Sequence, residues 1–277
     1  MAYKRILTIQ DISCVGQCSL TVALPIISAC GVETGIIPSA ILSTHTAGFS
    51  GFTFRDLTSD IPEIEKHWIK ENIKFDAVYT GYLGSTEQID YVKSIMDSTG
   101  KADSMNIVDP AMADNGKLYW GFDDEYVKGM AYLCSKADII LPNITEACFL
   151  TGVEYKESYD KAYVDLLISK LSEICKGTII ITGVSYDDKE INVVIADNGE
   201  QTPYVHRRIS KSFHGTGDIF SSAFVGAYMQ GKSMFDAVQI ASDYTVECIE
   251  NTVDDESHWY GTKFETALPS LIRMLDL

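Results

Sequence analysis

A glycine turn that leads into a helix of small residues is the stretch whose residue types could do chemistry. Gly215 and Gly217 allow backbone conformations that other residues resist, and Thr216 or Asp218 can cap the first helical turn. The first amides of such a helix have no internal partners and its dipole end is positive, so they suit a phosphate group or a developing oxyanion. Asp218 places a carboxylate there that can accept a proton from a substrate hydroxyl. An ordinary helix start with a capping aspartate would look the same, so the turn needs support from the rest of the chain.

Two further carboxylates, Asp109 and Glu146, stand at neighbouring strand–helix junctions of the expected fold, with Asn143 close by in sequence. Oxygen ligands, often acting through water, are what magnesium takes when it also holds phosphates. A pair of helix caps would place the same residue types at these junctions. We favour the metal site, because both carboxylates follow expected strands. We therefore predict that Asp109 and Glu146 belong to a magnesium site.

A small polar ring could bind near three other loops. Tyr82 lies in a glycine-flanked loop, where an aromatic side chain can stack on a flat substrate. Asp11, Ser13 and Thr46 can hydrogen-bond such a ring. The alternatives are a tyrosine packed beneath its loop and ordinary loop polarity. His45 could orient the loop that carries Thr46.

Strand and helix patterns alternate along the chain and decide where these residues meet. Strands are expected at residues 5–10, 33–38, 75–80, 105–108, 138–141 and 178–182, with an antiparallel pair at 192–196 and 202–208, and residues 11–17 are expected to form a loop. Helices are expected at 19–30, 61–72, 86–98, 123–135, 145–150, 159–175, 218–230, 234–251 and 264–275. This order predicts an α/β fold, a single domain over residues 1–277 with a mostly parallel central sheet and helices on both faces. Ligands of such sheets bind beyond the carboxyl ends of the strands.

The charge balance of the 277-residue chain is strongly acidic, with a formal net charge of −17 and a pI near 4.6. Such a protein repels nucleic acids and anionic membrane surfaces, so neither is an expected partner. A phosphate ligand then needs local positive charge or a divalent metal. Arg207, Arg208 and Lys211 form the clearest basic cluster, just before the glycine turn, and a solvated loop and a phosphate contact explain it equally well.

The seven cysteines are odd in number and form no Cys-x-x-Cys pair. This argues against a disulfide framework and against a zinc site. Reduced thiols fit a cytosolic enzyme best, so a cytoplasmic location is expected. The first residues enter a strand pattern without a signal peptide, and no apolar run approaches the ~20 residues of a membrane span.

The common nucleotide-binding and hydrolase motifs are absent from this sequence. It has no Gly-Lys-Ser/Thr phosphate loop, no Gly-x-Gly-x-x-Gly fingerprint after the first strand and no Gly-x-Ser-x-Gly elbow. If the protein uses ATP, the turn at 215–218 is the only good candidate for holding its phosphates.

Taken together, these patterns resemble the ribokinase superfamily and, within it, the bacterial pyridoxal (pyridoxamine) kinases. The resemblance covers essentially the whole chain and rests on seven motifs in the family's order. These motifs are Ile9-Gln10, Thr44-His45-Thr46, Gly81-Tyr82-Leu83-Gly84-Ser85, Asp109-Pro110-Ala111-Met112, Pro142-Asn143-Ile144-Thr145-Glu146, Thr182-Gly183 and Gly215-Thr216-Gly217-Asp218. It implies a ribokinase-like three-layer sandwich and ATP-dependent phosphorylation of the 5′-hydroxyl of pyridoxal, pyridoxamine or pyridoxine, a reaction of vitamin B6 salvage.

The resemblance also implies roles for the phosphoryl-transfer residues. Asp218 corresponds to the general base that takes the proton from the primary alcohol, and the amides of Gly215, Thr216 and Gly217 to the anion hole. Asp109 and Glu146 correspond to residues that help to hold Mg²⁺, mostly through water. ATP and Mg²⁺ are therefore the expected cofactors, and a need for a monovalent cation is left open.

Residues that bind the two substrates follow in the same way. Asn143 corresponds to a residue of the nucleotide–metal site, and Thr182 and Gly183 to residues that line the ATP site. Tyr82 and Thr46 correspond to contacts of the pyridine ring. Relatives of this kind form homodimers, so a homodimer is expected here.

The first loop departs from the pyridoxal kinase pattern. These kinases usually carry Ser directly after Ile-Gln, whereas Asp11 takes that position here and the loop is shorter. Asp at this point, together with His214 before Gly-Thr-Gly, is similar to the related hydroxymethylpyrimidine kinases. We hypothesise that an anionic Asp11 pairs with a protonated pyridine nitrogen. An unchanged KM across pH in Asp11→Ser would contradict this hypothesis.

Three functions are therefore compared. A pyridoxal kinase is favoured by Tyr82 in its Gly-Tyr-Leu-Gly setting. A hydroxymethylpyrimidine kinase of thiamine synthesis has the same fold. A non-catalytic nucleotide-binding protein on that fold is disfavoured by the intact Asp218 and its glycines, because a pure binder does not need the base.

Overall fold

The computed structural model describes residues 3–209, 211 and 213–277. These residues build a nine-stranded sheet in the order β11-β10-β9-β8-β5-β4-β1-β2-β3, with a separate two-stranded ribbon, β6-β7. Neighbours from β2 through β9 are parallel, and the antiparallel pairs are β2–β3, β9–β10 and β10–β11. The strands are β1 (Arg5–Ser13), β2 (Glu33–Leu42), β3 (Phe54–Asp56), β4 (Phe75–Thr80), β5 (Gly100–Val108), β6 (Ala113–Asp114), β7 (Lys117–Leu118), β8 (Ile139–Ile140), β9 (Thr178–Val184), β10 (Glu190–Asp197) and β11 (Glu200–Arg207).

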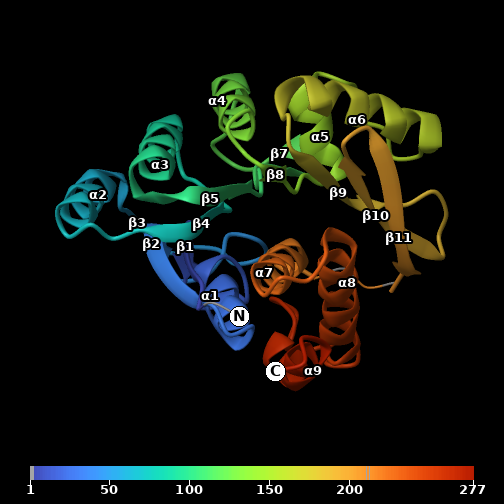
Figure 1. Cartoon of the computed structure of the whole chain (residues 1–277). Coiled ribbons are helices and arrows are strands. Elements are labelled where there is room, and N and C mark those ends of the chain that lie inside the picture. The colour runs from blue at the N-terminus through green and yellow to red at the C-terminus, as the bar shows by residue number, and fades with distance from the viewer. Residues whose placement is uncertain (1–2, 210, 212) are drawn as a thin grey trace.

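Helices cover both faces of this sheet (Figure 1). One face carries α2 (Ile61–Lys70), α3 (Thr86–Thr99), α4 (Asp124–Cys134), α5 (Ile144–Thr151) and α6 (Lys161–Ile174). The other carries α1 (Leu20–Ala29), α7 (Thr216–Met229), α8 (Met234–Glu250) and α9 (Leu268–Met274). Two 3₁₀ turns, η1 (Thr58–Asp60) and η2 (Phe264–Ala267), precede α2 and α9. The predicted α/β sandwich with a mostly parallel central sheet is confirmed.

Two hydrophobic cores lie on either side of the sheet, because successive side chains of a strand point to opposite faces. In β9, Ile179 and Ile181 belong to the core under α2–α6, whereas Ile180 belongs to the core under α1 and α7–α9. In β1, Leu7 likewise belongs to the first of these cores and Ile6 to the second. Strands buried on both faces therefore appear in the sequence as continuous apolar runs.

The first strand is longer than the sequence pattern predicted. Residues 11–13 were expected in a loop, but Ile12 and Ser13 continue the pairing with β2, opposite Ile41 and Leu42. The register of this pair shifts between Gln10 and Ile12, which places Asp11 at an irregularity of the strand. Such bulges kink a strand and re-aim a side chain, often next to a functional site.

Other differences concern short or proline-bounded elements. The strand expected at 105–108 begins five residues earlier, at Gly100, and the helix expected at 264–275 is a 3₁₀ turn followed by α9. Proline has no amide hydrogen and suits a helix start, so Pro269 marks the beginning of α9. The β6–β7 hairpin was not predicted, although Asn115 and Gly116, both with positive φ, are a typical hairpin turn.

Within residues 3–209, 211 and 213–277, no helix is both long and apolar enough to span a membrane.

Candidate active site

A cavity of about 750 Å³ opens at the carboxyl ends of the central strands. Beside the cavity the strand order reverses, because β2 and β4 lie on opposite sides of β1. Ligands of such sheets bind at switch points of this kind. Most of the predicted site residues line this cavity, namely Asp11, Ser13, Thr46, Tyr82, Asp109, Asn143, Glu146, Thr182, Gly215, Gly217 and Asp218. Two do not line it: Gly183 directly follows Thr182, and Thr216 is the first residue of α7.

Asp218 stands in the first turn of α7 and faces the cavity. Its Oδ2 accepts a hydrogen bond of 3.1 Å from the backbone N–H of Ser19, which precedes α1. Burial raises the pKa of Asp218 to about 6, the Ser19 N–H opposes this, and the nearby Asp11 carboxylate adds to it. The carboxylate is thus held in place, and its pKa is closer to neutrality than that of an exposed aspartate.

The turn before α7 has the features of an anion site. Gly215 adopts a left-handed conformation with φ 79°, and a Cβ atom there would collide with the carbonyl oxygen of Gln17. No side chain of the described residues caps α7, whereas Ser85 and Asp123 cap α3 and α4. The first amides of α7, at the positive end of its dipole, therefore face the cavity without a side-chain acceptor.

Asp109 and Glu146 form a buried pair of acids at the sheet edge, with exposed fractions of 7% and 3%. The hydroxyl of Ser221 donates to Asp109 Oδ2 at 2.8 Å. The two oxygens of Glu146 accept backbone N–H groups, from Met112 at 3.2 Å and from Asn143 at 2.8 Å. Burial is the main cause that raises the pKa of both acids. A neighbouring carboxylate adds to it: Asp218 raises the pKa of Asp109, and Asp109 raises that of Glu146.

Asn143 and Glu146 also form a capping box at the start of α5. Asn143 Oδ1 accepts from the Glu146 N–H at 2.9 Å, and its Nδ2 donates to the Ala113 carbonyl at 2.9 Å. Glu146, one of the two predicted metal-site acids, therefore takes part in a helix cap and also lines the cavity, whereas Asp109 is bonded to Ser221. Among the described residues, no group of three or more His, Cys, Asp or Glu side chains is arranged to hold a metal ion. Two carboxylates whose charges repel and lack a basic partner suit an ion that is shared with phosphate oxygens and water.

The other end of the cavity is aromatic and acidic. The Tyr82 ring stacks on Phe122 with 5.4 Å between centroids, and Phe122 stacks on Tyr126 at 3.7 Å. Asp11 is 5% exposed, and the hydroxyl of Ser13 donates to its Oδ2 at 2.9 Å. Burial raises the pKa of Asp11, and its bonds with the hydroxyls of Ser19 and Ser13 oppose that shift.

His45 holds the loop that carries Thr46. Its Nε2 lies 2.8 Å from the Tyr260 carbonyl and donates to it, while Nδ1 accepts from the Ala47 N–H at 3.1 Å. These partners require a neutral ring with the proton on Nε2. Burial lowers the pKa of His45, which favours the neutral form, although the Tyr260 carbonyl opposes this shift.

The sequence patterns missed several residues around these groups. Ser221 follows Asp218 by three positions on α7, so helical spacing alone could have placed both on one face. Ser19 has an unusual positive φ of 52°, which no sequence signal indicated. Phe122 and the 93% exposed Trp120 come from the segment after β7 and line the cavity.

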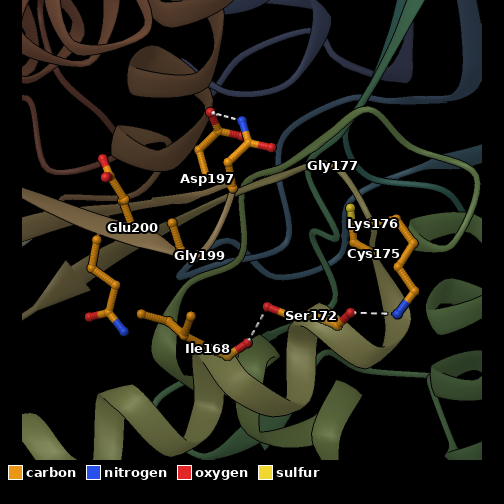
Figure 2. A pocket seen from close by; sticks show the side chains of 11 residues that line it. Ile168, Ser172, Cys175, Lys176, Gly177, Asp197, Gly199 and Glu200 are labelled. Atoms are coloured by element: carbon orange, nitrogen blue, oxygen red, sulfur yellow. Dashed lines mark hydrogen bonds between the residues drawn. The ribbon is translucent and has the colours of Figure 1, made fainter.

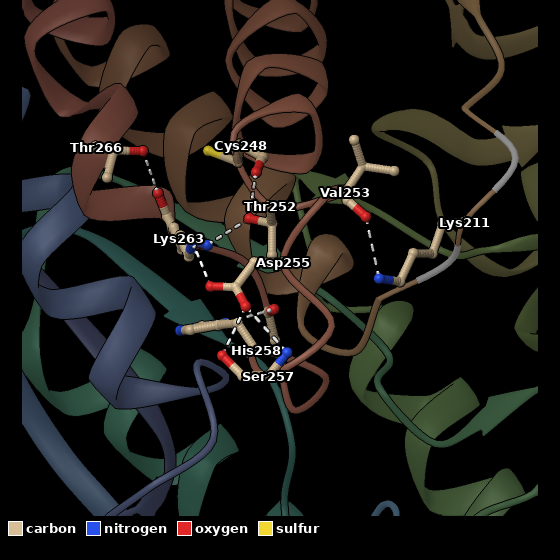
Figure 3. Close-up of polar contacts among 10 residues, drawn as sticks. Lys211, Cys248, Thr252, Val253, Asp255, Ser257, His258, Lys263 and Thr266 are labelled. Atoms are coloured by element: carbon tan, nitrogen blue, oxygen red, sulfur yellow. Dashed lines mark hydrogen bonds and ion pairs between the residues drawn. The ribbon is translucent and has the colours of Figure 1, made fainter.

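The basic cluster before the glycine turn lies outside the cavity lining. Arg207 pairs with Glu250, and Arg208 lies 3.9 Å from Asp188. Lys211 donates to the Val253 carbonyl at 3.2 Å (Figure 3). These contacts favour the solvated-loop interpretation over a phosphate contact.

A second, smaller pocket of about 190 Å³ lies between the end of α6 and the β10–β11 turn (Figure 2). Gly177, which lines it, directly precedes β9, so this pocket lies at the amino end of that strand. Its Lys176 donates to the Ser172 carbonyl at 2.7 Å, and Asp197 accepts from the Thr178 hydroxyl at 3.0 Å. It is separate from the predicted site residues.

This chain is similar to phosphomethylpyrimidine kinases and to pyridoxal kinases. A family model described as phosphomethylpyrimidine kinase matches residues 24–262. The hydroxymethylpyrimidine/phosphomethylpyrimidine kinase of Bacillus subtilis (strain 168) is 27% identical over 216 residues, 78% of each chain. The pyridoxal kinase of Dictyostelium discoideum is 26% identical over 241 residues, 80% of this chain and 77% of the relative.

A solved structure extends this similarity to the whole fold. A Bacteroides thetaiotaomicron VPI-5482 protein, crystallised in an orthorhombic form with pyridoxal, matches with a TM-score of 0.91 and 35% identity. The match covers 97% of this chain and 96% of that one. The chain therefore belongs to the phosphomethylpyrimidine kinase family and is a pyridoxal kinase-like kinase of the ribokinase superfamily.

Proposed function

We propose that this kinase transfers the γ-phosphoryl group of ATP to the 5′-hydroxyl of pyridoxal, pyridoxamine or pyridoxine, in vitamin B6 salvage. One observation carries the proposal. Asp218 is held at the uncapped start of α7, on the same cavity as the buried acids Asp109 and Glu146. Phosphoryl transfer depends mainly on positioning and charge neutralisation, and this arrangement supplies both.

Asp218 is the proposed general base. Its bond with the Ser19 N–H fixes one oxygen, which leaves the other free to accept the proton of the substrate hydroxyl. The amides of 215–217 are proposed to bind the charge that develops on the transferred phosphoryl group. The close approach of Gly215 to Gln17 leaves no room for a side chain at this position, which supports a role for its backbone.

Asp109, Glu146 and Asn143 are proposed to hold the metal–nucleotide end, with Thr182 beside the ATP. When bound there, Mg²⁺ neutralises the charge of the phosphates. Ser221 fixes Asp109 Oδ2, so its other oxygen is the one available to the ion or its water. The side chain of Asn143 is already bonded to the Glu146 N–H and to the Ala113 carbonyl, so its proposed role is to orient Glu146.

Tyr82 is proposed to stack on the pyridine ring, with Thr46, Ser13 and Asp11 near its polar substituents. The stack of Tyr82 on Phe122 supports this, because it holds the tyrosine ring in one orientation at the cavity wall. His45 positions Thr46 through the Ala47 N–H.

Hydroxymethylpyrimidine phosphorylation is the second candidate. Two observations favour it: Asp11 replaces the serine usual in pyridoxal kinases, and His214 precedes the glycine turn and lines the cavity. The similarity to the B. subtilis enzyme is as strong as that to the D. discoideum enzyme.

A coupled assay of ADP release tests both candidates, with pyridoxal, pyridoxamine, pyridoxine and hydroxymethylpyrimidine as acceptors. The proposal expects the highest kcat/KM with one of the three pyridines. A higher value with the pyrimidine would establish the second candidate instead. ATP binding without turnover of any acceptor would indicate a non-catalytic nucleotide-binding protein.

We also propose a cytoplasmic homodimer. All seven cysteines are free, which supports a reducing compartment. Sedimentation at micromolar concentration tests the dimer, and a monomer mass would contradict it.

A further inference from the structure

Residues 258–263, between α8 and η2, contact two loops of the cavity from outside and do not line the cavity themselves. We propose that this segment, here called the rear support, is a positioning element that holds the acceptor loop (residues 43–53) and the β1–α1 loop (residues 14–19) in place for phosphoryl transfer. Trp259 contacts the first loop and Gly261 the second. This inference rests on the proposed function.

The acceptor loop rests on the rear support through packed rings and one hydrogen bond. Phe49 packs on Trp259 with 4.6 Å between ring centroids, and a Cβ atom at Gly48 would collide with the Trp259 ring. His45 Nε2 donates to the Tyr260 carbonyl at 2.8 Å. Because this loop also carries residues that line the cavity, the position of their side chains depends on a tryptophan that lies outside it.

The β1–α1 loop meets the rear support at a second point. A Cβ atom at Gly261 would come within 2.5 Å of Gln17 Cβ and 3.1 Å of the Gly16 carbonyl oxygen, so the two segments are in close contact. The side chain of Gln17 also donates to Glu265 at 2.9 Å. The Gln17 carbonyl oxygen in turn lies against Gly215 of the glycine turn. A shift of Gln17 would therefore reach the proposed anion hole.

Two residues of the β1–α1 loop have a backbone conformation that side chains disfavour. Gln17 has φ 54° and Ser19 has φ 52°. Such conformations persist only where the surrounding structure imposes them, and they cluster at functional sites. The Ser19 N–H is the group that holds Asp218, at 3.1 Å. The contact between Gly261 and Gln17 supplies part of this constraint, two residues away from the bond that orients the base.

Polar contacts fasten the rear support to the end of α8 (Figure 3). Lys263 pairs with Asp255 at 2.6 Å, and the N–H of Lys263 donates to the Thr252 hydroxyl at 2.8 Å. Within the segment, His258 Nδ1 donates to the Gly261 carbonyl at 3.1 Å. These contacts limit the freedom of the segment, and a positioning element must itself be held in this way.

Trp259→Ala tests the contact with the acceptor loop. It removes the ring that packs on Phe49, so we expect the KM for pyridoxal, or for hydroxymethylpyrimidine if that is the better acceptor, to rise at least about tenfold. The Kd for ATP should change by less than about threefold, because the nucleotide end is untouched. Trp259→Phe keeps a ring and should restore most of the wild-type KM. Trp68→Ala is the matched control, because Trp68 likewise packs on a phenylalanine, Phe75, at 5.3 Å, but on α2.

Gly261→Ala tests the contact with the β1–α1 loop. The added methyl group pushes against Gln17, so we expect kcat to fall at least about fivefold while the acceptor KM changes by less than about threefold. A double-mutant cycle tests whether Trp259 acts through the loop that carries Thr46. Trp259→Ala should raise the KM by a smaller factor in Thr46→Val than in the wild type. Initial rates give kcat and KM, and calorimetry gives the Kd of ATP and of the acceptor.

Three results would overturn the inference: an acceptor KM that Trp259→Ala leaves unchanged, an equal rise of this KM in Trp68→Ala, or additive effects of Trp259→Ala and Thr46→Val. A thermal melt shows whether each variant is folded, and Trp259→Leu replaces Trp259→Ala, with the same expectations, if the alanine variant is not. If the wild type phosphorylates no acceptor, the proposed function fails instead. The Kd of pyridoxal in wild type, Trp259→Ala and Trp68→Ala then decides the inference without turnover.

Discussion

Two acids of the cavity, Asp218 and Asp109, and one acid of the outer surface, Asp255, have opposite electrostatic environments. Asp218 and Asp109 are desolvated, contact only an N–H or a hydroxyl, and have raised pKa values. Asp255 lies on the surface, where Lys263 approaches it at 2.6 Å (Figure 3). The Lys263 bond and the hydroxyl and N–H of Ser257 lower the pKa of Asp255. Asp255 thus has a basic partner, whereas Asp218 and Asp109 have none among the described residues.

This difference shows where the protein gives up stability for function. A desolvated carboxylate without a positive partner opposes folding, and groups with such raised pKa values cluster at functional sites. Positive charge brought by a ligand would relieve the repulsion, so the cavity acids are suited to a metal ion or a protonated ring. The four predictions below test the contrast, beginning with the largest expected effect.

Replacement of the base should have the largest effect. Asp218→Asn keeps the size of the side chain but cannot take a proton, so we expect kcat to fall by about 10²–10⁴-fold. The Kd for ATP should change by less than about threefold, because the amides of α7 remain. Initial rates and calorimetry measure the two quantities. Lost ATP binding would mean that Asp218 has a structural role.

The buried acid beside Ser221 should control the metal requirement. In Asp109→Asn, we expect the Mg²⁺ concentration for half-maximal activity to rise by about tenfold or more. A magnesium titration of the initial rate measures this effect, with Asp103→Asn as the surface control. An unchanged titration would remove Asp109 from the metal site.

The pKa of Asp218 predicts a pH profile. Since burial raises it to about 6 and the ionised form is the active base, kcat/KM should rise with pH up to about 6 and level off above it. Below that value we expect a fall of about tenfold per pH unit. The residual activity of Asp218→Asn should lack this acidic limb. If the variant retains the limb, another group controls it.

Stability should change in opposite directions in the two regions. The folded pKa of Asp218 is about 6 against an ordinary 3.8, so its ionisation weakens the fold as pH rises through this window. Asp218→Asn should therefore stabilise the protein at pH 7.5, by roughly 1–3 kcal/mol after allowance for solvent. The pKa of Asp255 is lowered, so its contribution is present at neutral pH and lost in acid. Asp255→Asn should lower Tm slightly. Thermal melts measure both variants, and Tm changes of the same sign in the two would contradict the contrast.

The arrangement of strands and helices could be predicted because it depends on local patterns. Apolar runs such as 178–182 marked the strands, and the antiparallel β10–β11 pair was predicted correctly. The extension of β1 to Ser13 was missed, because the polar residues there have little strand propensity of their own. Pairing with β2 holds them in the strand. Short elements such as β3 contain too few residues for a periodic signal.

The candidate site was predicted in part. Residues that follow strands were located well, since parallel strands end at one edge of a sheet. The contacts that tune them were not found: Ser19 reaches Asp218 across 199 positions, and Ser221 reaches Asp109 across 112. The engagement of Arg207 with Glu250 likewise depends on how β11 packs beside α8.

The amino-acid sequence by itself determined the order of elements, the two-sided burial of the sheet and the glycine turn with its acid, because these follow from hydrophobic periodicity and backbone sterics. Only the tertiary structure decided which charges meet. It brought six acids onto one cavity without a lysine or arginine among the described lining residues, and it placed Lys263 beside Asp255. The reason is physical: a pKa depends on burial and on neighbours distant in sequence, and both are set only when the chain has folded.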